Sequence, residues 1–232
     1  MHIPDIIAHR GASRECRENT LAAFALAIEQ GADGIELDVH GSADGHLVVH
    51  HDPMVRHAAG EGDRPRAIRE MTLDEIRLVR LDGGHPLPLL SDVFDLVAGR
   101  VTLYVEVKAA AVERAVAALL DRYPDTRAAV HAFDHRIPVA VRALRPGTPI
   151  GVLSDLYPID LSALLRPAAP TALWQHALLI DHALVRTAHA DGVQVIAWTE
   201  NDPTLARMLA SWGVDGLCTD VPAVLRAAFA HG

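Results

Sequence analysis

The chain has 232 residues, half of them hydrophobic, and a formal net charge of −9 at pH 7. This length allows a sizeable buried core, and no apolar run is long enough to cross a membrane. The negative charge argues against non-specific binding to nucleic acid, and it means that an anionic substrate would need a local cluster of cations. The two cysteines make no disulfide framework and the first residues lack a secretory signal, so we expect a cytoplasmic protein.

The chain begins with a short apolar run at 3–8, which predicts a strand. Asn19 or Thr20 then offers a helix cap, and apolar residues at helical spacing follow as far as Gly31. A second strand is expected next, and a further short apolar run lies at 47–49.

The second strand, at 34–40, has the two-residue period of a β-strand. Its apolar residues point to one face, and Glu36, Asp38 and His40 point to the other. Two carboxylates on one face repel each other unless a cation lies between them, and oxygen ligands suit Mg²⁺ or Ca²⁺. An edge strand with a wet acidic face is the alternative. Because the same alternation recurs around Glu106, the metal site is favoured.

The region 53–88 interrupts this pattern. Its segment 60–66 is polar and rich in glycine and proline, which indicates an excursion from the main fold. Within the region, the pattern at 72–81 predicts one helix.

Strands and helices alternate regularly after this region. Further strands are expected at 101–107, 128–133, 149–153, 171–174, 193–198 and 214–218. Helical patterns lie at 91–97, 112–122, 137–144, 161–165, 182–189, 204–211 and 221–230. With the first two strands the total is eight, and 232 residues over eight units is about 29 each, which predicts an α/β fold of the TIM (β/α)8 barrel type. An open doubly wound sheet is the alternative, but the chain has no glycine-rich dinucleotide loop.

The barrel prediction has a consequence for position, because catalytic groups in such barrels lie at the carboxyl ends of strands. Several charged or aromatic residues end the expected strands: His9, Arg10, Glu36, Asp38, Glu106, Lys108 and Trp198. Interior barrel positions are mostly apolar, so this clustering on one rim predicts an active site.

Seven blocks of residues carry a family resemblance. In chain order they are His9-Arg10-Gly11, Glu18-Asn19-Thr20, Glu36-Leu37-Asp38, His51-Asp52, Glu106-Val107-Lys108, Trp198-Thr199-Glu200-Asn201, and Gly213-Val214-Asp215-Gly216 with Thr219-Asp220 and Pro222. In these blocks the chain resembles the glycerophosphodiester phosphodiesterase family nearly end to end. The resemblance implies a metal-dependent barrel enzyme, one domain over 1–232, that hydrolyses glycerophosphodiesters to glycerol 3-phosphate and an alcohol. It also matches 53–88 with the family's small insertion, here rather short.

The resemblance implies that Glu36, Asp38 and Glu106 bind one divalent ion, Mg²⁺ or Ca²⁺, with Mn²⁺ as a further choice. Such a site leaves positions open for substrate, and the ion polarises phosphoryl oxygens. Three carboxylates around one divalent ion leave a net charge of minus one, so Arg10 and Lys108 are expected to hold the anionic phosphodiester. A rim lysine that only pairs with Glu106 is the alternative for Lys108.

His9 and His51 are the expected general acid and base, because imidazole titrates near neutrality. Successive residues of a strand point to opposite faces, so only one of His50 and His51 can face the mouth, and the family's His-Asp pair favours His51. Two routes remain open: direct attack by water, or attack by the substrate's own glycerol 2-hydroxyl.

Other positions have supporting roles. Glu18 and Asn19 are expected to lie behind the ligands and the catalytic groups. Trp198 is expected to wall the substrate pocket rather than fill the barrel top, whereas Trp174 and Trp212 are expected to be packing residues.

Three residues near the strand ends are harder to interpret. His131 stands where many relatives have part of a Ser-Phe pair, so it either faces the mouth and alters the pocket or is inert. Glu200 replaces a more usual apolar residue, and the sequence gives no reason for it. Asp220, before Pro222, is expected to cap the last helix.

Two other functions fit the sequence less well than hydrolysis of small glycerophosphodiesters. An enzyme that acts on membrane lipid would need apolar or aromatic mouth loops, whereas 60–69 is charged and aromatic residues make up 4% of the chain. An inactive binding module would be expected to lose some of the proposed ligands and histidines, and all of them are present. We therefore expect a small-molecule substrate, no nucleic-acid partner and no stable membrane anchoring, with the alcohol and the oligomeric state left open.

Overall fold

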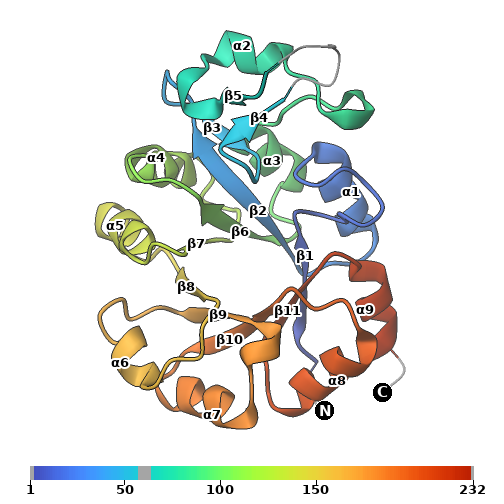
Figure 1. The fold of residues 1–232 in the computed structure, drawn as a ribbon, viewed down its shortest axis with the longest axis vertical. Coiled ribbons are helices and arrows are strands. Elements are labelled where there is room, and N and C mark those ends of the chain that lie inside the picture. Colours follow the sequence, from blue (N-terminus) through green and yellow to red (C-terminus); the bar gives the residue numbers. More distant parts are fainter. Residues whose placement is uncertain (1–2, 57–63, 231–232) are drawn as a thin grey trace.

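Eight parallel strands form a closed barrel in the computed structural model, which describes residues 3–56 and 64–230 (Figure 1). In chain order they are β1 (Asp5–His9), β2 (Gly34–Gly41), β6 (Thr102–Val107), β7 (Ala128–Ala132), β8 (Ile150–Ser154), β9 (Ala172–His176), β10 (Gln194–Trp198) and β11 (Gly216–Thr219). Each strand pairs with the next, and β1 pairs with both β2 and β11, which closes the sheet. The predicted TIM barrel is confirmed, and the open sheet is excluded.

Helices follow the strands and ring the barrel (Figure 1). They are α1 (Leu21–Glu29), α3 (Leu90–Val97), α4 (Glu113–Arg122), α5 (Arg136–Leu144), α6 (Leu161–Leu165), α7 (His182–Ala190), α8 (Pro203–Ser211) and α9 (Pro222–Phe229). Thr20 is the cap of α1, since its side chain accepts a hydrogen bond from the backbone of Ala23. The apolar faces of these helices pack on the outer side of the sheet, where Phe94 and Val105 are buried, and Trp212 packs there as expected.

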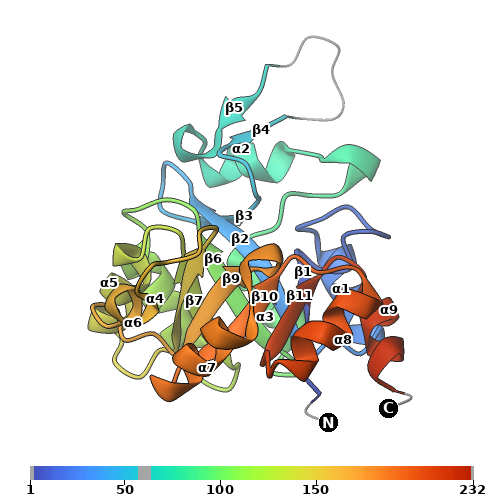
Figure 2. The ribbon, with the colours of Figure 1, turned by 60° about the horizontal axis from the view of Figure 1, so that its bottom comes forward.

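Residues 53–56 and 64–88 belong to an excursion beside the end of β2. It follows β3 (Leu47–Val49), which pairs antiparallel with β2, and contains β4 (Met54–Val55), β5 (Arg66–Ala67), η1 (Ile68–Glu70), α2 (Leu73–Leu78) and η2 (Asp82–Gly84). Figure 2 shows it standing above one end of the barrel. Residues 57–63, which include part of the polar segment at 60–66, lie outside the described residues.

The predicted helix at 72–81 is wrong at its carboxyl end, because α2 ends at Leu78. Val79 is extended, and Arg80 then pairs with Pro86 as an antiparallel bridge. Val79 and Leu81 are buried in a small separate core beside Val48, which a continuing helix would not have allowed.

The inside of the barrel changes character along its axis. Its middle is apolar, with Ile7, Leu153, Trp174, Ile196 and Cys218 in one cluster. The polar residues lie beyond this cluster, at the carboxyl ends of β1, β2, β6 and β7. The apolar cluster thus separates the mouth of the barrel from its opposite end. Within the described ranges, no helix is long and apolar enough to cross a membrane.

Candidate active site

The register of neighbouring strands brings the predicted site residues together. His9 on β1 lies beside Glu36 on β2, Asp38 lies beside Glu106 on β6, and Glu106 lies beside His131 on β7. In-register residues of parallel strands point the same way, so these side chains share the mouth of the barrel. A cavity opens there, lined by His9, Arg10, Glu36, His51, Glu106, Lys108, His131, Phe133, Leu153, Trp174, Trp198 and Cys218.

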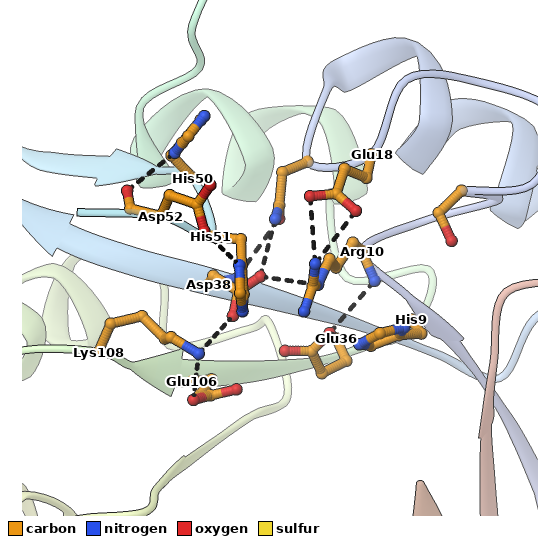
Figure 3. Close-up of polar contacts among 12 residues, drawn as sticks. His9, Arg10, Glu18, Glu36, Asp38, His50, His51, Asp52, Glu106 and Lys108 are labelled. Atoms are coloured by element: carbon orange, nitrogen blue, oxygen red, sulfur yellow. Dashed lines mark hydrogen bonds and ion pairs between the residues drawn. The ribbon is translucent and has the colours of Figure 1, made fainter. Parts of the chain in front are cut away.

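Two cations contact the buried carboxylates (Figure 3). The Nζ atom of Lys108 lies 2.8 Å from Oε1 of Glu106 and 3.3 Å from Oδ1 of Asp38. Nε of Arg10 lies 3.1 Å from the other oxygen of Asp38. Lys108 therefore contacts two carboxylates rather than Glu106 alone.

The three carboxylates differ in how far neighbouring cations compensate their negative charge. Burial would raise the pKa of Asp38, but Arg10 and Lys108 outweigh it and lower that pKa. Burial raises the pKa of Glu36 well above its usual value, and the charges of Asp38 and Glu106 add to the effect. The pKa of Glu106 is also raised, by burial and by Asp38. The cations compensate Asp38, whereas the surroundings of Glu36 and Glu106 disfavour their charged forms.

These residues fit a divalent cation. Donor atoms of Glu36, Glu106 and His131 all lie within 4.8 Å of one another. Oδ1 of Asp38 is buried, and within the described part of the chain it makes the ion pair with Lys108 at 3.3 Å but no hydrogen bond of good geometry. A divalent ion would compensate the charge that Arg10 and Lys108 leave, and carboxylate oxygens are its usual ligands.

Glu18 and Asn19 contact the charged residues from behind. Nη1 of Arg10 donates to both carboxylate oxygens of Glu18 at 3.1 Å. Nδ2 of Asn19 donates to Oδ2 of Asp38 at 2.8 Å. The pair therefore fixes the direction of one guanidinium and one carboxylate.

His9 is held by an aspartate. Its Nδ1 donates to Oδ1 of Asp220 at 2.7 Å, because an ionised carboxylate only accepts. Its Nε2 faces the cavity, 4.0 Å from Oε2 of Glu36. Asp220 also accepts hydrogen bonds from Ser13 and Asn201. Burial would raise the pKa of Asp220, but the bonds from His9 and Asn201 outweigh it and lower the pKa to about 2.

The expected capping role of Asp220 is wrong. The residue that precedes α9 is Val221, and it makes no side-chain capping bond. The carboxylate of Asp220 instead accepts a hydrogen bond from Nδ1 of His9 and so orients this ring. The sequence carried one signal for this role, since Asp220 belongs to the last block of the family resemblance.

His51 has a matching arrangement. Its Nδ1 donates to Oδ1 of Asp52 at 2.9 Å, and its ring lines the cavity. The ring of His50 does not line it and bonds instead to the backbone oxygen of Asp52 at 2.9 Å. The structure thus puts His51, and not His50, at the mouth.

Aromatic rings also line the cavity. Trp198 contacts Phe133 and His176 edge-on, with ring centroids 5.6 Å and 5.3 Å apart. The buried ring of His131 stacks on Trp174, with centroids 4.2 Å apart. Burial lowers the pKa of His131 to about 3, so the imidazole is neutral near pH 7.

Glu200 lies apart from the cavity wall. It is buried, and its Oε1 accepts a hydrogen bond from the backbone of Asp202 at 2.7 Å. Asp202 caps α8, so Glu200 orders the turn that leads into this helix. This contact explains a glutamate where an apolar residue is more usual.

Comparison with known proteins agrees with this geometry. Residues 9–224 match the glycerophosphoryl diester phosphodiesterase family. A glycerophosphodiester phosphodiesterase of Caldanaerobacter subterraneus is 34% identical over 238 residues, which cover 95% of each chain.

Solved structures show the same fold. The Oleispira antarctica phosphodiesterase, determined with its product sn-glycerol-3-phosphate, superposes with a TM-score of 0.87 at 27% identity and covers 97% of this chain and 96% of its own. The Thermotoga maritima glycerophosphodiester phosphodiesterase gives a TM-score of 0.83 at 28% identity, with 98% and 99% covered. The chain therefore belongs to the glycerophosphoryl diester phosphodiesterase family and is a phosphodiesterase of that type.

Proposed function

We propose that the chain hydrolyses glycerophosphodiesters to glycerol 3-phosphate and an alcohol, with a divalent cation held by Glu36, Asp38 and Glu106. The observation that carries the proposal is the meeting of three buried carboxylates with two cations, an excess of one acidic group, at a mouth that also holds His9 and His51. Such a charge excess is costly unless a cation compensates it. Mg²⁺, Ca²⁺ and Mn²⁺ all accept this oxygen-rich donor set.

The cation, when bound, would polarise the phosphoryl oxygens and offset the charge that develops on them. Arg10 and Lys108 supply the remaining positive charge at the cavity wall. Both are partly buried, so their attraction for a phosphodiester is screened less than that of surface cations.

The two histidines divide the proton transfers. An aspartate holds Nδ1 of each ring, Asp220 for His9 and Asp52 for His51, so the tautomer is fixed and Nε2 is left to exchange protons with substrate. One ring accepts a proton from the attacking oxygen, and the other donates a proton to the departing alcohol.

Chelation tests the proposal. Protein treated with EDTA should release no glycerol 3-phosphate from glycerophosphocholine, and added Mg²⁺, Ca²⁺ or Mn²⁺ should restore release. Glu36→Gln should weaken cation binding, whereas Glu200→Gln is the matched control, a buried glutamate outside the cavity. Full activity in excess chelator, with no metal found by elemental analysis, would contradict the proposed metal dependence.

A second candidate substrate class is a glycerophosphodiester that carries an acyl chain. The loops after β7, β8 and β9 expose large apolar side chains: Phe133, Leu156, Tyr157, Ile159 and Leu178. Parallel strands bring these loops to the mouth of the barrel, and Phe133 also lines the cavity. The charged segment at 60–69 and the low aromatic content, which argued against lipid substrates, do not describe these loops.

Comparing lysophosphatidylcholine with glycerophosphocholine tests this candidate. Ile159→Asp with Leu178→Asp should raise KM for the lysophospholipid several-fold and leave KM for glycerophosphocholine unchanged. Val224→Asp, an exposed apolar position on α9, is the control. Equal effects on both substrates, or no turnover of lysophospholipid, would limit the chain to water-soluble diesters.

A further inference from the structure

His131 has a ring nitrogen that no neighbour uses. The side chain is 1% exposed, and its Nδ1 is buried with no hydrogen-bond partner among the described residues. A buried polar atom without a partner is costly, so it usually marks an ion, a ligand or a water that completes the site. The imidazole therefore has hydrogen-bonding or ligating capacity that the described residues do not satisfy.

Carboxylates surround this ring on one side. His131 is the register partner of Glu106 on the next strand, and one of its ring nitrogens lies within 4.8 Å of carboxylate oxygens of both Glu106 and Glu36. Ligand atoms on opposite sides of one Mg²⁺ or Ca²⁺ ion are about 4.0–5.2 Å apart, twice the bond length. The three side chains are thus spaced to share one ion.

The ring orientation is fixed by packing. His131 stacks on Trp174 with an angle of 5° between the ring planes. Gly151 lies beside both rings, and a Cβ atom there would come within 2.8 Å of Trp174 and 3.1 Å of the Cβ of His131. The absence of a side chain at Gly151 lets the two rings stack, and the stack presents the imidazole at the carboxylates.

We propose that His131 is a nitrogen ligand of the divalent cation and shares it with Glu36 and Glu106. The inference rests on the proposed function only in that both use the same cation. An imidazole in an otherwise oxygen donor set favours Mn²⁺, Co²⁺ or Zn²⁺ over Ca²⁺. His131 therefore decides which metal this protein prefers.

Pulsed EPR of Mn²⁺-loaded protein tests the ligand directly. Protein labelled with ¹⁵N-histidine should show a ¹⁵N hyperfine coupling to Mn²⁺, and His131→Asn should abolish it. His50→Gln, at a histidine outside the cavity, should retain the coupling. A coupling that survives in His131→Asn would assign the nitrogen to another histidine and overturn the inference.

Calorimetry supplies the second measurement. His131→Asn should weaken Mn²⁺ or Co²⁺ binding about 10-fold or more, and Ca²⁺ binding by clearly less. His131→Gln serves as a second variant if His131→Asn unfolds at a lower temperature than the wild type. Equal losses for Mn²⁺ and Ca²⁺, or no loss, would show that His131 only packs in the wall.

The two proposals fail in different ways. Metal-dependent hydrolysis without nitrogen coupling would overturn the role of His131 and leave the proposed function intact. Nitrogen coupling in a protein that hydrolyses no glycerophosphodiester would do the reverse. Failure of the wild-type protein to bind Mn²⁺ or Co²⁺ while it binds Mg²⁺ or Ca²⁺ would overturn the role of His131 alone, and failure to bind any of the four ions would overturn both.

Discussion

At the mouth of the barrel, a histidine hydrogen-bonded to an aspartate occurs twice. His9 and His51 come from different segments, yet each offers Nδ1 to an aspartate and its ring to the cavity. His9→Ala and His51→Ala should each lower kcat by roughly 10²–10⁴-fold, the usual size of general acid–base catalysis. His50→Ala should cost little, because that ring lies outside the cavity. Steady-state kinetics on glycerophosphocholine would show the difference, and an inactive His50 variant beside an active His51 variant would reverse the assignment.

Asp220 orients His9 and is also expected to stabilise the folded protein. Its pKa is lowered to about 2 by hydrogen bonds that outweigh burial, whereas an aspartate in an unfolded chain titrates near about 3.9. A carboxyl group whose pKa is lower in the folded than in the unfolded state stabilises the fold at pH values above its unfolded pKa. This contribution is lost as the pH falls from about 4 to about 2. Asp220→Asn should therefore reduce the free energy of unfolding at pH 7, and by about half as much near pH 3.

Urea unfolding at the two pH values would measure this difference. Asp125→Asn, at an exposed aspartate in the loop before β7, is the control and should change stability little at either pH. A constant gap between the wild type and Asp220→Asn would show that the carboxylate contributes no pH-dependent stability.

Which of these residues can be predicted from the sequence depends on how local their partners are. The strand-end rule places Glu36, Asp38 and Glu106 at the mouth, because each position follows from the two-residue period of its own strand. Asp220 has the same local sequence whether it caps a helix or holds a histidine, and only the closed barrel brings it to His9. Whether His131 faces the mouth depends in the same way on Trp174, two strands away.

Among the elements, the connection from β1 to α1 has little room. Gly11 has a φ of +85°, and a Cβ there would come within 2.7 Å of the backbone of Ala23 in α1. Gly45 has nearly the same φ, +86°, but nothing lies within 4 Å of its added Cβ. The pair separates the cost of the backbone conformation from the cost of the close approach.

Gly11→Ala should lower the free energy of unfolding by about 2–4 kcal/mol, the sum of the left-handed backbone penalty and overpacking. Gly45→Ala should cost only about 1 kcal/mol, from the backbone alone. Guanidinium unfolding midpoints would measure both. Equal losses would mean that the loop carrying Arg10 moves freely away from α1.

The excursion contains a helix whose carboxyl end could not be predicted from local sequence spacing. Helical spacing continues through 72–81, but the chain leaves the helix after Leu78 because Val79 and Leu81 are buried in a core of their own. That core includes Val48, which precedes Val79 by 31 residues (79 − 48) in the sequence. Local spacing cannot contain this information, whereas the barrel strands need only their own apolar runs.

At the scale of the whole molecule, closure of the barrel turns separate strand ends into one site. The two histidine–aspartate pairs come from β1 with the end of β11 and from the segment after β3, and the carboxylates come from β2 and β6. The chain is negative overall, so the local charge balance at the mouth matters more for a phosphodiester than the net charge does. The alternation of strands and helices predicts this meeting point, and the long-range contacts decide which side chains reach it.

The complete site bears on the identity of the nucleophile. Two oriented histidines suit a route in which the glycerol 2-hydroxyl attacks phosphorus and forms a five-membered cyclic phosphate. One ring takes the proton of the 2-hydroxyl while the other protonates the departing alcohol, and the roles reverse when water opens the cyclic phosphate. The internal nucleophile is already positioned, which removes much of the entropic cost that a free water molecule would carry.

This route makes a prediction about the substrate rather than the protein. A glycerophosphodiester that lacks the 2-hydroxyl should bind as a competitive inhibitor and turn over poorly, because it keeps the phosphate and the alcohol but has lost the nucleophile. Inhibition constants and ³¹P NMR of the parent reaction would test it, since the cyclic phosphate has its own resonance. A 2-deoxy substrate hydrolysed as fast as its parent would rule out the cyclic route and leave direct attack by water, with one histidine as its base and the other as the acid for the leaving alcohol.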